Sequence, residues 1–183
     1  KVKEIIESDR QRVYVVPSAP GKRFEGDTKV TDMLYAYHAA VSRGESGDEI
    51  FEEIRQRFID IRDGLGVSTD IESHLDKIAA DVQAGACEDY TVSRGEYLNG
   101  LLLADYLGFD FIDPAGAIFF NANGVYESEK TRTVMRGRLR QSRTAVIPGF
   151  YGSMPDGTIK TFSRGGSDIT GAIVARAAKA DVY

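Results

Sequence analysis

Along the chain, short apolar segments alternate with longer segments in which apolar residues recur at the spacing of an α-helix. The short segments are rich in β-branched or aromatic residues and predict buried strands; they cover residues 12–17, 109–112, 117–120 and 144–148. The longer segments predict helices; they cover residues 30–43, 47–63, 69–84, 93–107, 131–141 and 167–180. A Pro-Asp-Gly sequence at residues 155–157 predicts a hairpin turn between two short extended pieces.

The order of these elements predicts the fold class. Strands that are apolar throughout and that alternate with helices are typical of an α/β domain with a mainly parallel central sheet. The consecutive helices between residues 30 and 107 interrupt this alternation, and we expect them to pack as a helical excursion on one side. Since no repeat, low-complexity tract or linker divides the sequence, residues 1–183 are predicted to form one domain.

Both ends of the chain have the pattern of interrupted elements. Residues 1–8 resemble the tail of a helix already under way, and residues 180–183 resemble a helix end that continues into a strand. The sequence has no initiator Met. We therefore expect the chain to be a segment of a longer protein, and its fold to be incomplete.

Composition and charge narrow the range of functions. Hydrophobic residues make up 42% and charged residues 28% of the 183 residues, which is ordinary for a globular protein. A net charge of -5 gives no support to nucleic-acid binding, and no stretch approaches the roughly 20 apolar residues of a membrane helix. The single cysteine, Cys87, favours a cytoplasmic setting. One cysteine and two histidines are too few to predict a zinc site, whereas Mg²⁺ carried by substrate phosphates is compatible with the sequence.

The strongest candidate for a binding site is the sequence FSRGGSD at residues 162–168, here called the glycine loop. Its two glycines let the backbone approach a ligand closely, and the N-terminus of the helix that follows favours an anion. Arg164 adds a guanidinium suited to a carboxylate or phosphate. Asp168 would repel that anion unless an ammonium, a lysine or Mg²⁺ lay between them. The alternative is a plain Gly-Gly turn before a helix capped by Ser167 or Asp168, with Arg164 in solvent.

A second candidate is the sequence SRGE at residues 93–96. Glu96 follows Ser93 by three residues, which is the spacing of a capping box in which Glu96 binds the backbone amide of Ser93. The functional alternative is that the Glu96 carboxylate faces a substrate ammonium. The local sequence favours the capping box but leaves both interpretations open.

The third candidate is the loop PSAPG at residues 17–21, together with Thr31 at the start of the next predicted helix. This loop follows a predicted strand, and the carboxyl ends of parallel strands are where α/β sheets bind ligands. Thr31 fits a helix N-cap equally well. The sequence around this loop therefore does not decide between a binding role and a structural one.

These three sequences together resemble the motifs of the aspartate kinases. The segment from GFYG at 149–152 to the glycine loop resembles the Gly-Phe…Gly-Arg-Gly-Gly-Ser-Asp signature of that family, and SRGE resembles its Ser-x-Gly-Glu motif. VVPSA at 15–19 with VTDML at 30–34 resembles its Val-Val-Ser-Ala…Thr-Asn/Asp-Leu-Leu segment. The motifs occur in the family's order and span nearly the whole chain. The resemblance moves the interpretation of Glu96, Thr31 and the glycine loop toward function.

The resemblance implies an amino-acid-kinase fold, which is a three-layer α/β/α sandwich with a mostly parallel central sheet. The reaction it implies is transfer of the γ-phosphoryl group of ATP, with Mg²⁺ bound through the phosphates, to the β-carboxylate of L-aspartate. The product would be 4-phospho-L-aspartate, in the first step of lysine, threonine and methionine biosynthesis. The intact protein is expected to be a homo-oligomer in the cytoplasm.

The same resemblance implies roles for single residues. Arg164 would bind the α-carboxylate of aspartate, Glu96 its α-ammonium, and Asp168 would organise a catalytic lysine of the family's N-terminal strand. The other substrate-binding residues would supply backbone, hydroxyl or wall contacts; they are Ser18, Thr31, Phe150, Gly165, Gly166 and Ser167. Because the nucleophile is already an ionised carboxylate, catalysis would need positioning and charge neutralisation and no general base.

Two parts of the family pattern are missing from this sequence. The family's Lys-Phe-Gly-Gly strand, expected before residue 1, and its Thr-Asp nucleotide loop and regulatory domains, expected after residue 183, are not among these residues. We therefore expect most of the ATP-binding residues to lie outside the chain, and the chain by itself to be inactive.

Three alternatives stay open. The first is another amino acid kinase, acting on glutamate, N-acetylglutamate or a nucleotide, against which the paired motifs argue. The second is a non-catalytic module that binds an amino acid in the same site without ATP. The third is a purely structural α/β domain.

Overall fold

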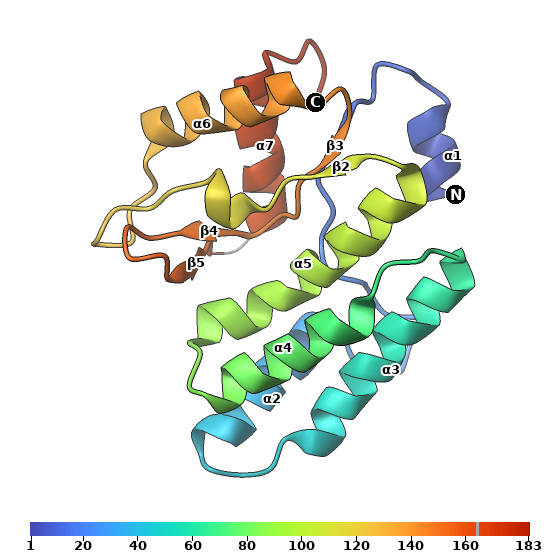
Figure 1. The fold of residues 1–183 in the computed structure, drawn as a ribbon, viewed down its shortest axis with the longest axis vertical. Helices are drawn as coiled ribbons and strands as arrows, with labels where there is room; N and C mark the ends of the chain where they lie inside the picture. Colours follow the sequence, from blue (N-terminus) through green and yellow to red (C-terminus); the bar gives the residue numbers. More distant parts are fainter. Residues whose placement is uncertain (164) are drawn as a thin grey trace.

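The structure consists of three layers, with a small parallel sheet between two groups of helices (Figure 1). It is a computed structural model that describes residues 1–163 and 165–183. The helices are α1 (Val2–Glu7), α2 (Val30–Ser42), α3 (Asp48–Leu65), α4 (Ile71–Gln83), α5 (Glu88–Leu107), the 3₁₀ turn η1 (Pro114–Gly116), α6 (Ser128–Gln141) and α7 (Gly166–Ala178). The strands are β1 (Tyr14–Val15), β2 (Asp110–Phe111), β3 (Ala145–Val146), β4 (Tyr151–Ser153) and β5 (Ile159–Thr161). Helices α6 and α7 form one outer layer, and α5 with α2, α3 and α4 forms the other.

The sheet has the order β1-β3-β2, and both of its pairings are parallel. Since its strands run in one direction, the loops after β1 and β3 leave from the same edge, where the Gly149 amide donates to the carbonyl oxygen of Pro17 at 3.0 Å. The antiparallel hairpin of β4 and β5 follows the β3 loop. The predicted α/β class, with its parallel sheet, its Pro-Asp-Gly hairpin turn and a helical excursion, is confirmed.

Two hydrophobic clusters stabilise the molecule, and their buried members do not overlap. The first joins α2, α3, α4 and α5; its fully buried side chains include Leu34, Ile54, Phe58, Leu75 and Leu102. The second joins the sheet to α6 and α7; its members include Ile118, Met135, Ile147 and Val174. Burying each such side chain contributes about 1.5–3 kcal/mol, so each cluster is a substantial core.

Helix α5 links the two clusters through a close approach to the sheet. Its Leu98 and Leu102 belong to the first cluster. At Gly100, a Cβ atom would lie 2.5 Å from Cγ of Pro148 and 3.2 Å from the ring of Phe111. Only glycine fits at this contact, and it lets α5 lie directly on the ends of β2 and β3.

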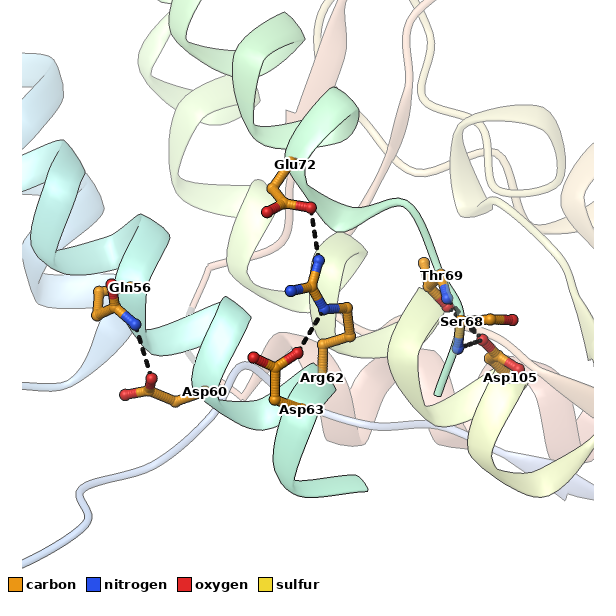
Figure 2. A network of polar contacts seen from close by, with 8 residues as sticks. All are labelled: Gln56, Asp60, Arg62, Asp63, Ser68, Thr69, Glu72 and Asp105. Atoms are coloured by element: carbon orange, nitrogen blue, oxygen red, sulfur yellow. Dashed lines mark hydrogen bonds and ion pairs between the residues drawn. The ribbon is translucent and has the colours of Figure 1, made fainter. Parts of the chain in front are cut away.

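Polar contacts tie the helical excursion together at one end of α5 (Figure 2). Arg62 on α3 donates to Oε2 of Glu72 on α4 at 2.5 Å. Asp105, in the last turn of α5, accepts from the backbone amides of Ser68 and Thr69 at 3.0 and 2.9 Å, and from the Thr69 hydroxyl at 2.7 Å. These exposed contacts are individually weak, but together they fix the α3–α4 connection to α5.

Two helices begin earlier than the sequence predicts. Helix α5 begins at Glu88, not at residue 93, and α6 begins at Ser128, not at residue 131. Glu88 and Asp89 occupy the first turn of α5, where carboxylates are stabilised by the positive end of the helix dipole. Tyr90 and Val92 are the apolar residues of this added segment, and their spacing of two does not extend the helical repeat.

Two predicted strands do not form among the described residues. The segment 117–120 makes only single bridges, from Phe119 to Ser153 and from Phe120 to Tyr126, after the 3₁₀ turn η1 has bent the chain. Residues 180–183 are irregular, and the Tyr183 hydroxyl donates to the carbonyl oxygen of Asp168 at 2.8 Å. In the part of the chain that the structure describes, no helix is long and apolar enough to cross a bilayer.

Candidate substrate-binding site

A cavity of about 910 Å³ lies where the β1 and β3 loops, the hairpin and the first turn of α7 meet. Eight of the nine predicted site residues line it: Ser18, Thr31, Glu96, Phe150, Gly165, Gly166, Ser167 and Asp168. The ninth, Arg164, lies outside the described residues. Segments that are distant in sequence therefore form one concave site at the edge of the sheet where α/β folds bind ligands.

Glu96 is the most unusual residue of the cavity. Glu96 is only 5% exposed to solvent. Within the described residues, its buried Oε2 atom has no hydrogen-bond partner. Burial raises the pKa of Glu96 from 4.5 to about 7, although hydrogen bonds from the backbone of Glu96 and Ala19 and the charge of Arg94 oppose the rise. A buried carboxyl oxygen without a hydrogen-bond partner is costly and suits a cationic ligand.

The capping-box interpretation of SRGE is wrong. Ser93 lies inside α5, where its hydroxyl donates to the carbonyl oxygen of Tyr90 at 2.7 Å, so it cannot cap the helix. Gly95 is required by the β1 loop, because a Cβ atom there would lie 2.9 Å from Cβ of Ala19. The glycine thus brings the β1 loop against the helix turn that carries Glu96.

The β1 loop and α2 form a second wall. Thr31 is half-buried in the first turn of α2, but the N-cap of that helix is Lys29, so the N-cap interpretation of Thr31 is wrong. Ser18 is exposed, and its carbonyl oxygen accepts from Nδ2 of Asn99 on α5 at 2.7 Å. Tyr35, one turn beyond Thr31, also lines the cavity. The sequence did not single it out, because it lies off the apolar face of α2.

The loop between Gly21 and Asp27 is held by a buried ion pair. Nη1 of Arg57 on α3 lies 2.9 Å from Oδ2 of Asp27, and both side chains are nearly inaccessible to solvent. Asp27 also accepts from the backbone amide of Arg23 at 2.8 Å, and Arg57 donates to the carbonyl oxygen of Thr28 at 2.9 Å. These contacts anchor the segment that connects two of the cavity-lining residues, Ser18 and Thr31.

The glycine loop forms the third wall. Gly165 has a left-handed backbone, with φ of 73°, and is the N-cap of α7, which begins at Gly166 without a side-chain cap from the described residues. The predicted caps, Ser167 and Asp168, instead belong to the first turn of the helix. The amides of a first turn have no partner within the helix, so this end of the cavity suits an anion.

The hairpin contributes residues that the sequence did not single out. Lys160 and Thr161 on β5 line the cavity and both contact Asp89 of α5, with Nζ of Lys160 at 2.7 Å from Oδ2. Phe120, Tyr126 and Phe162 form a cluster of rings with centroids 4.9 to 6.3 Å apart along the same wall. Phe162 begins the glycine loop, whereas no sequence motif marked Lys160, Thr161, Phe120 or Tyr126.

Arg94, two residues before Glu96 on α5, has a buried guanidinium. Arg94 is only 6% exposed, and its Cζ atom lies 4.5, 4.8 and 5.0 Å from the ring centroids of Tyr90, Tyr97 and Tyr151. It donates to the Ser93 hydroxyl at 2.9 Å. Rings and hydroxyls thus replace water around this cation.

A model of the amino acid kinase family matches residues 1–183. The chain belongs to the amino acid kinase family. This amino acid kinase sequence is similar to aspartokinase 3 of Bacillus subtilis, with 34% identity over 200 aligned positions that take in all of this chain and 43% of that protein. It is also similar to aspartokinase 2 of the same species, with 30% identity over 128 positions, which cover 64% of this chain and 31% of that protein.

Solved aspartate kinase structures have the same fold as this amino acid kinase chain. The aspartate kinase of Clostridium acetobutylicum superposes with a TM-score of 0.95 and 47% identity, covering 98% of this chain and 42% of that one. Aspartokinase III of E. coli, in complex with aspartate and ADP, superposes with a TM-score of 0.77 and 24% identity, covering 96% of this chain and 42% of that one. The chain thus spans less than half the length of these relatives.

Proposed function

We propose that this domain carries the amino-acid acceptor site of an aspartate kinase, which phosphorylates the β-carboxylate of L-aspartate. The observation that carries the proposal is the placement of Glu96, whose buried carboxyl lines the same cavity as the first turn of α7 and whose Oε2 atom has no hydrogen-bond partner among the described residues. One end of the cavity suits an ammonium and the other suits a carboxylate. An α-amino acid presents these two groups together.

The proposed binding mode leaves one carboxylate of aspartate free to react. Glu96 binds the α-ammonium, and Arg164 with the amides of Gly165, Gly166 and Ser167 binds the α-carboxylate. Thr31 and Phe150 line the space around the side chain, and Ser18 contributes from the β1 loop. With both α-groups held, the β-carboxylate is the nucleophile that remains, and it is ionised at neutral pH.

The phosphoryl donor in this proposal is ATP, with Mg²⁺ bound through its phosphates. Asp168 supports this, because it is exposed in the first turn of α7 and lines the cavity. A carboxylate in that position favours a cation between itself and the phosphates, which a lysine or Mg²⁺ would supply. A solved relative of the same fold, E. coli aspartokinase III, is known in complex with aspartate and ADP.

A phosphoryl-transfer assay on the full-length protein tests the proposal. L-Aspartate, L-glutamate and N-acetyl-L-glutamate are offered separately with ATP and Mg²⁺, and ADP release is measured. We expect turnover with aspartate and about 100-fold lower kcat/KM with the other two acceptors, because a missing or displaced polar contact is heavily penalised in a buried site. A preference for glutamate or N-acetylglutamate would make the domain a different amino acid kinase. Binding of aspartate without turnover would favour a non-catalytic module.

Arg164→Ala in the same protein tests the assignment of the α-carboxylate. We expect the KM for aspartate to rise by at least about 10-fold, the loss of one charge-assisted contact, while the KM for ATP stays unchanged. An unchanged KM for aspartate would remove Arg164 from the acceptor site.

A further inference from the structure

Phe150 has a backbone conformation that few side chains adopt. Its φ is 84°, in the left-handed region, where a residue with a Cβ atom is strained. Among the described non-glycine residues, only Lys179 shares a positive φ, and Lys179 ends α7 in the usual left-handed C-cap position. Phe150 ends no helix and lines the cavity, so its conformation needs a local explanation.

The backbone of Phe150 is held at both of its peptide groups. Its amide donates to Oγ1 of Thr170 at 3.1 Å, and its carbonyl oxygen accepts from the amide of Phe162 at 2.8 Å. Thr170 is fully buried on α7, and its hydroxyl donates to the carbonyl oxygen of Gly166 at 2.9 Å. One hydroxyl therefore joins the strained residue to the first residue of α7.

Packing around this hydroxyl permits little movement. A Cβ atom at Gly166 would lie 2.5 Å from Cδ2 of Phe150, so the ring rests directly on the glycine backbone. A Cβ atom at Gly149 would lie 2.5 Å from Oγ of Ser167. The β3 loop and the start of α7 are thus interlocked at two adjacent positions, and the Thr170 hydroxyl bonds to both segments, at the amide of Phe150 and the carbonyl oxygen of Gly166.

We infer that Thr170 is a positioning residue for the acceptor site. Its hydroxyl holds the strained Phe150 backbone at a fixed spacing from the amides that open α7, so that the wall of the cavity and its anion-binding end keep their geometry. Thr170 does not itself line the cavity. The inference rests on the proposed aspartate-binding function and adds to it a residue outside the predicted site.

Two substitutions at one position test this role in the full-length protein. Thr170→Val keeps the volume of the side chain and removes the hydroxyl, whereas Thr170→Ser keeps the hydroxyl and removes a methyl group. We expect Thr170→Val to raise the KM for aspartate about 10-fold or more and to change the KM for ATP less than about twofold. Thr170→Ser should restore the KM for aspartate to within about threefold of wild type. Equal impairment by both variants, or no rise with Val, would overturn the inference.

Thr131 provides a matched structural control. It is also fully buried on a helix, and its Oγ1 also accepts from a backbone amide outside that helix, that of Phe119, at 2.9 Å. Thr131 does not line the cavity. Thr131→Val should lower the Tm as Thr170→Val does while leaving the KM for aspartate unchanged. A rise in KM with both variants would show a general effect of lost stability and would contradict a specific role for Thr170.

A readout that does not depend on catalysis separates this inference from the proposed function. Amide hydrogen exchange at Phe150, followed by NMR, should become at least about 10-fold faster in Thr170→Val and stay near wild type in Thr170→Ser. If the wild type proves inactive toward aspartate while this exchange pattern is seen, the proposed function fails and the positioning of Phe150 stands. Unchanged exchange in Thr170→Val would overturn the positioning even in an active enzyme.

Discussion

The guanidinium of Arg94 lies over the ring of Tyr151, with Cζ 5.0 Å from the ring centroid, and so joins α5 to β4. The Tyr151 hydroxyl continues this connection by donating to Oδ1 of Asp113 at 2.9 Å. Tyr151 is fully buried, and burial raises the pKa of its hydroxyl. A cation, a ring and a carboxylate thus connect the helix that carries Glu96 to the hairpin and to the loop after β2.

We expect Arg94→Met to destabilise the fold by about 2 kcal/mol or more, because each desolvated cation–π contact contributes up to about that amount and the hydroxyl of Ser93 loses a donor. Urea unfolding followed by circular dichroism measures the change. The control is Lys130→Met, since Lys130 lies over the ring of Phe119 at 4.4 Å but is half exposed. The control should cost less than about 1 kcal/mol, and equal losses would show that burial of Arg94 adds nothing.

Aspartate binding should depend on pH through Glu96. Burial raises the pKa of Glu96 to about 7, and a substrate ammonium requires the ionised carboxylate. We therefore expect the KM for aspartate to rise about 10-fold for each pH unit below 7 and to level off above about pH 8. Steady-state kinetics measures this pH dependence of the KM. A range of roughly pH 5.5 to 8.5 is suitable, because most proteins are stable there. In Glu96→Gln the KM should be high and independent of pH, and a slope that persists in this variant would assign the titration to another group.

Glu96→Gln should also stabilise the empty protein at neutral pH. Because the pKa is 4.5 when unfolded and about 7 when folded, the folded state holds its proton more tightly, and the free energy of unfolding falls as the pH rises from 4.5 to 7. Above pH 7 the accumulated penalty is about 3 kcal/mol, which the amide does not incur. Thermal unfolding of both forms at pH 4.5 and pH 8 checks this. The gain should be small at pH 4.5, and a gain of equal size at both values would exclude ionisation as its cause.

The contacts of Asp89 with Lys160 and Thr161 should hold the part of the cavity wall that β5 forms. Asp89→Asn weakens the hold on Lys160 and removes a charge that Thr161 also contacts. We expect a rise of about three- to tenfold in the KM for aspartate with little change in Tm, because the pair is partly exposed. The control is Asp76→Asn, which removes the exposed partner of Arg55 at 2.6 Å on the helical excursion, outside the residues that line the cavity. The same rise in the control would contradict a specific effect of the hairpin.

Two glycine substitutions should have opposite effects. Gly149→Ala introduces a Cβ atom 2.7 Å from Cα of Ser167, so the start of α7 must move, and we expect lost activity and at least about 2 kcal/mol of lost stability. Gly137→Ala lies in α6 with open space around it and should stabilise by about 0.5–1 kcal/mol through helix propensity. Denaturant unfolding of both variants decides. Unchanged stability and activity in Gly149→Ala would contradict a tight contact between the β3 loop and the start of α7.

The sequence was informative wherever a periodic pattern or a family motif extended over many residues. Helices α2, α3 and α4 were predicted because their buried residues recur at helical spacing, and the parallel sheet followed from the alternation of apolar runs with helices. The beginning of α5 was not predicted, because Tyr90 and Val92, the apolar residues between 88 and 92, are two residues apart and do not show helical spacing. Capping patterns misled at Ser93 and Thr31, since a local motif cannot show whether the helix has already begun before it.

The parts of the site that the sequence could not provide depend on tertiary contacts. Lys160 belongs to a three-residue strand whose only distinguishing feature is its contact with Asp89, 71 residues away. Thr170 is an ordinary helix residue until its hydroxyl is placed beside the amide of Phe150. The buried oxygen of Glu96 likewise became evident only from the packing of Ala19 against Gly95. Such roles arise from contacts between residues that are far apart in the sequence, and the periodicity of the sequence does not encode these contacts.

The two hydrophobic clusters are joined through α5, and this determines how a ligand would act on the whole molecule. Thr31 and Glu96 lie on helices of the first cluster, whereas Phe150 and Gly166 lie beside the second. At Gly100 the helical layer is in direct contact with Pro148, which follows β3, so the boundary between the two layers runs along α5. A ligand held at both ends would cross this boundary and act as a removable crosslink between the layers. Saturation of the site would then suppress slow exchange of amides far from the cavity, throughout both cores.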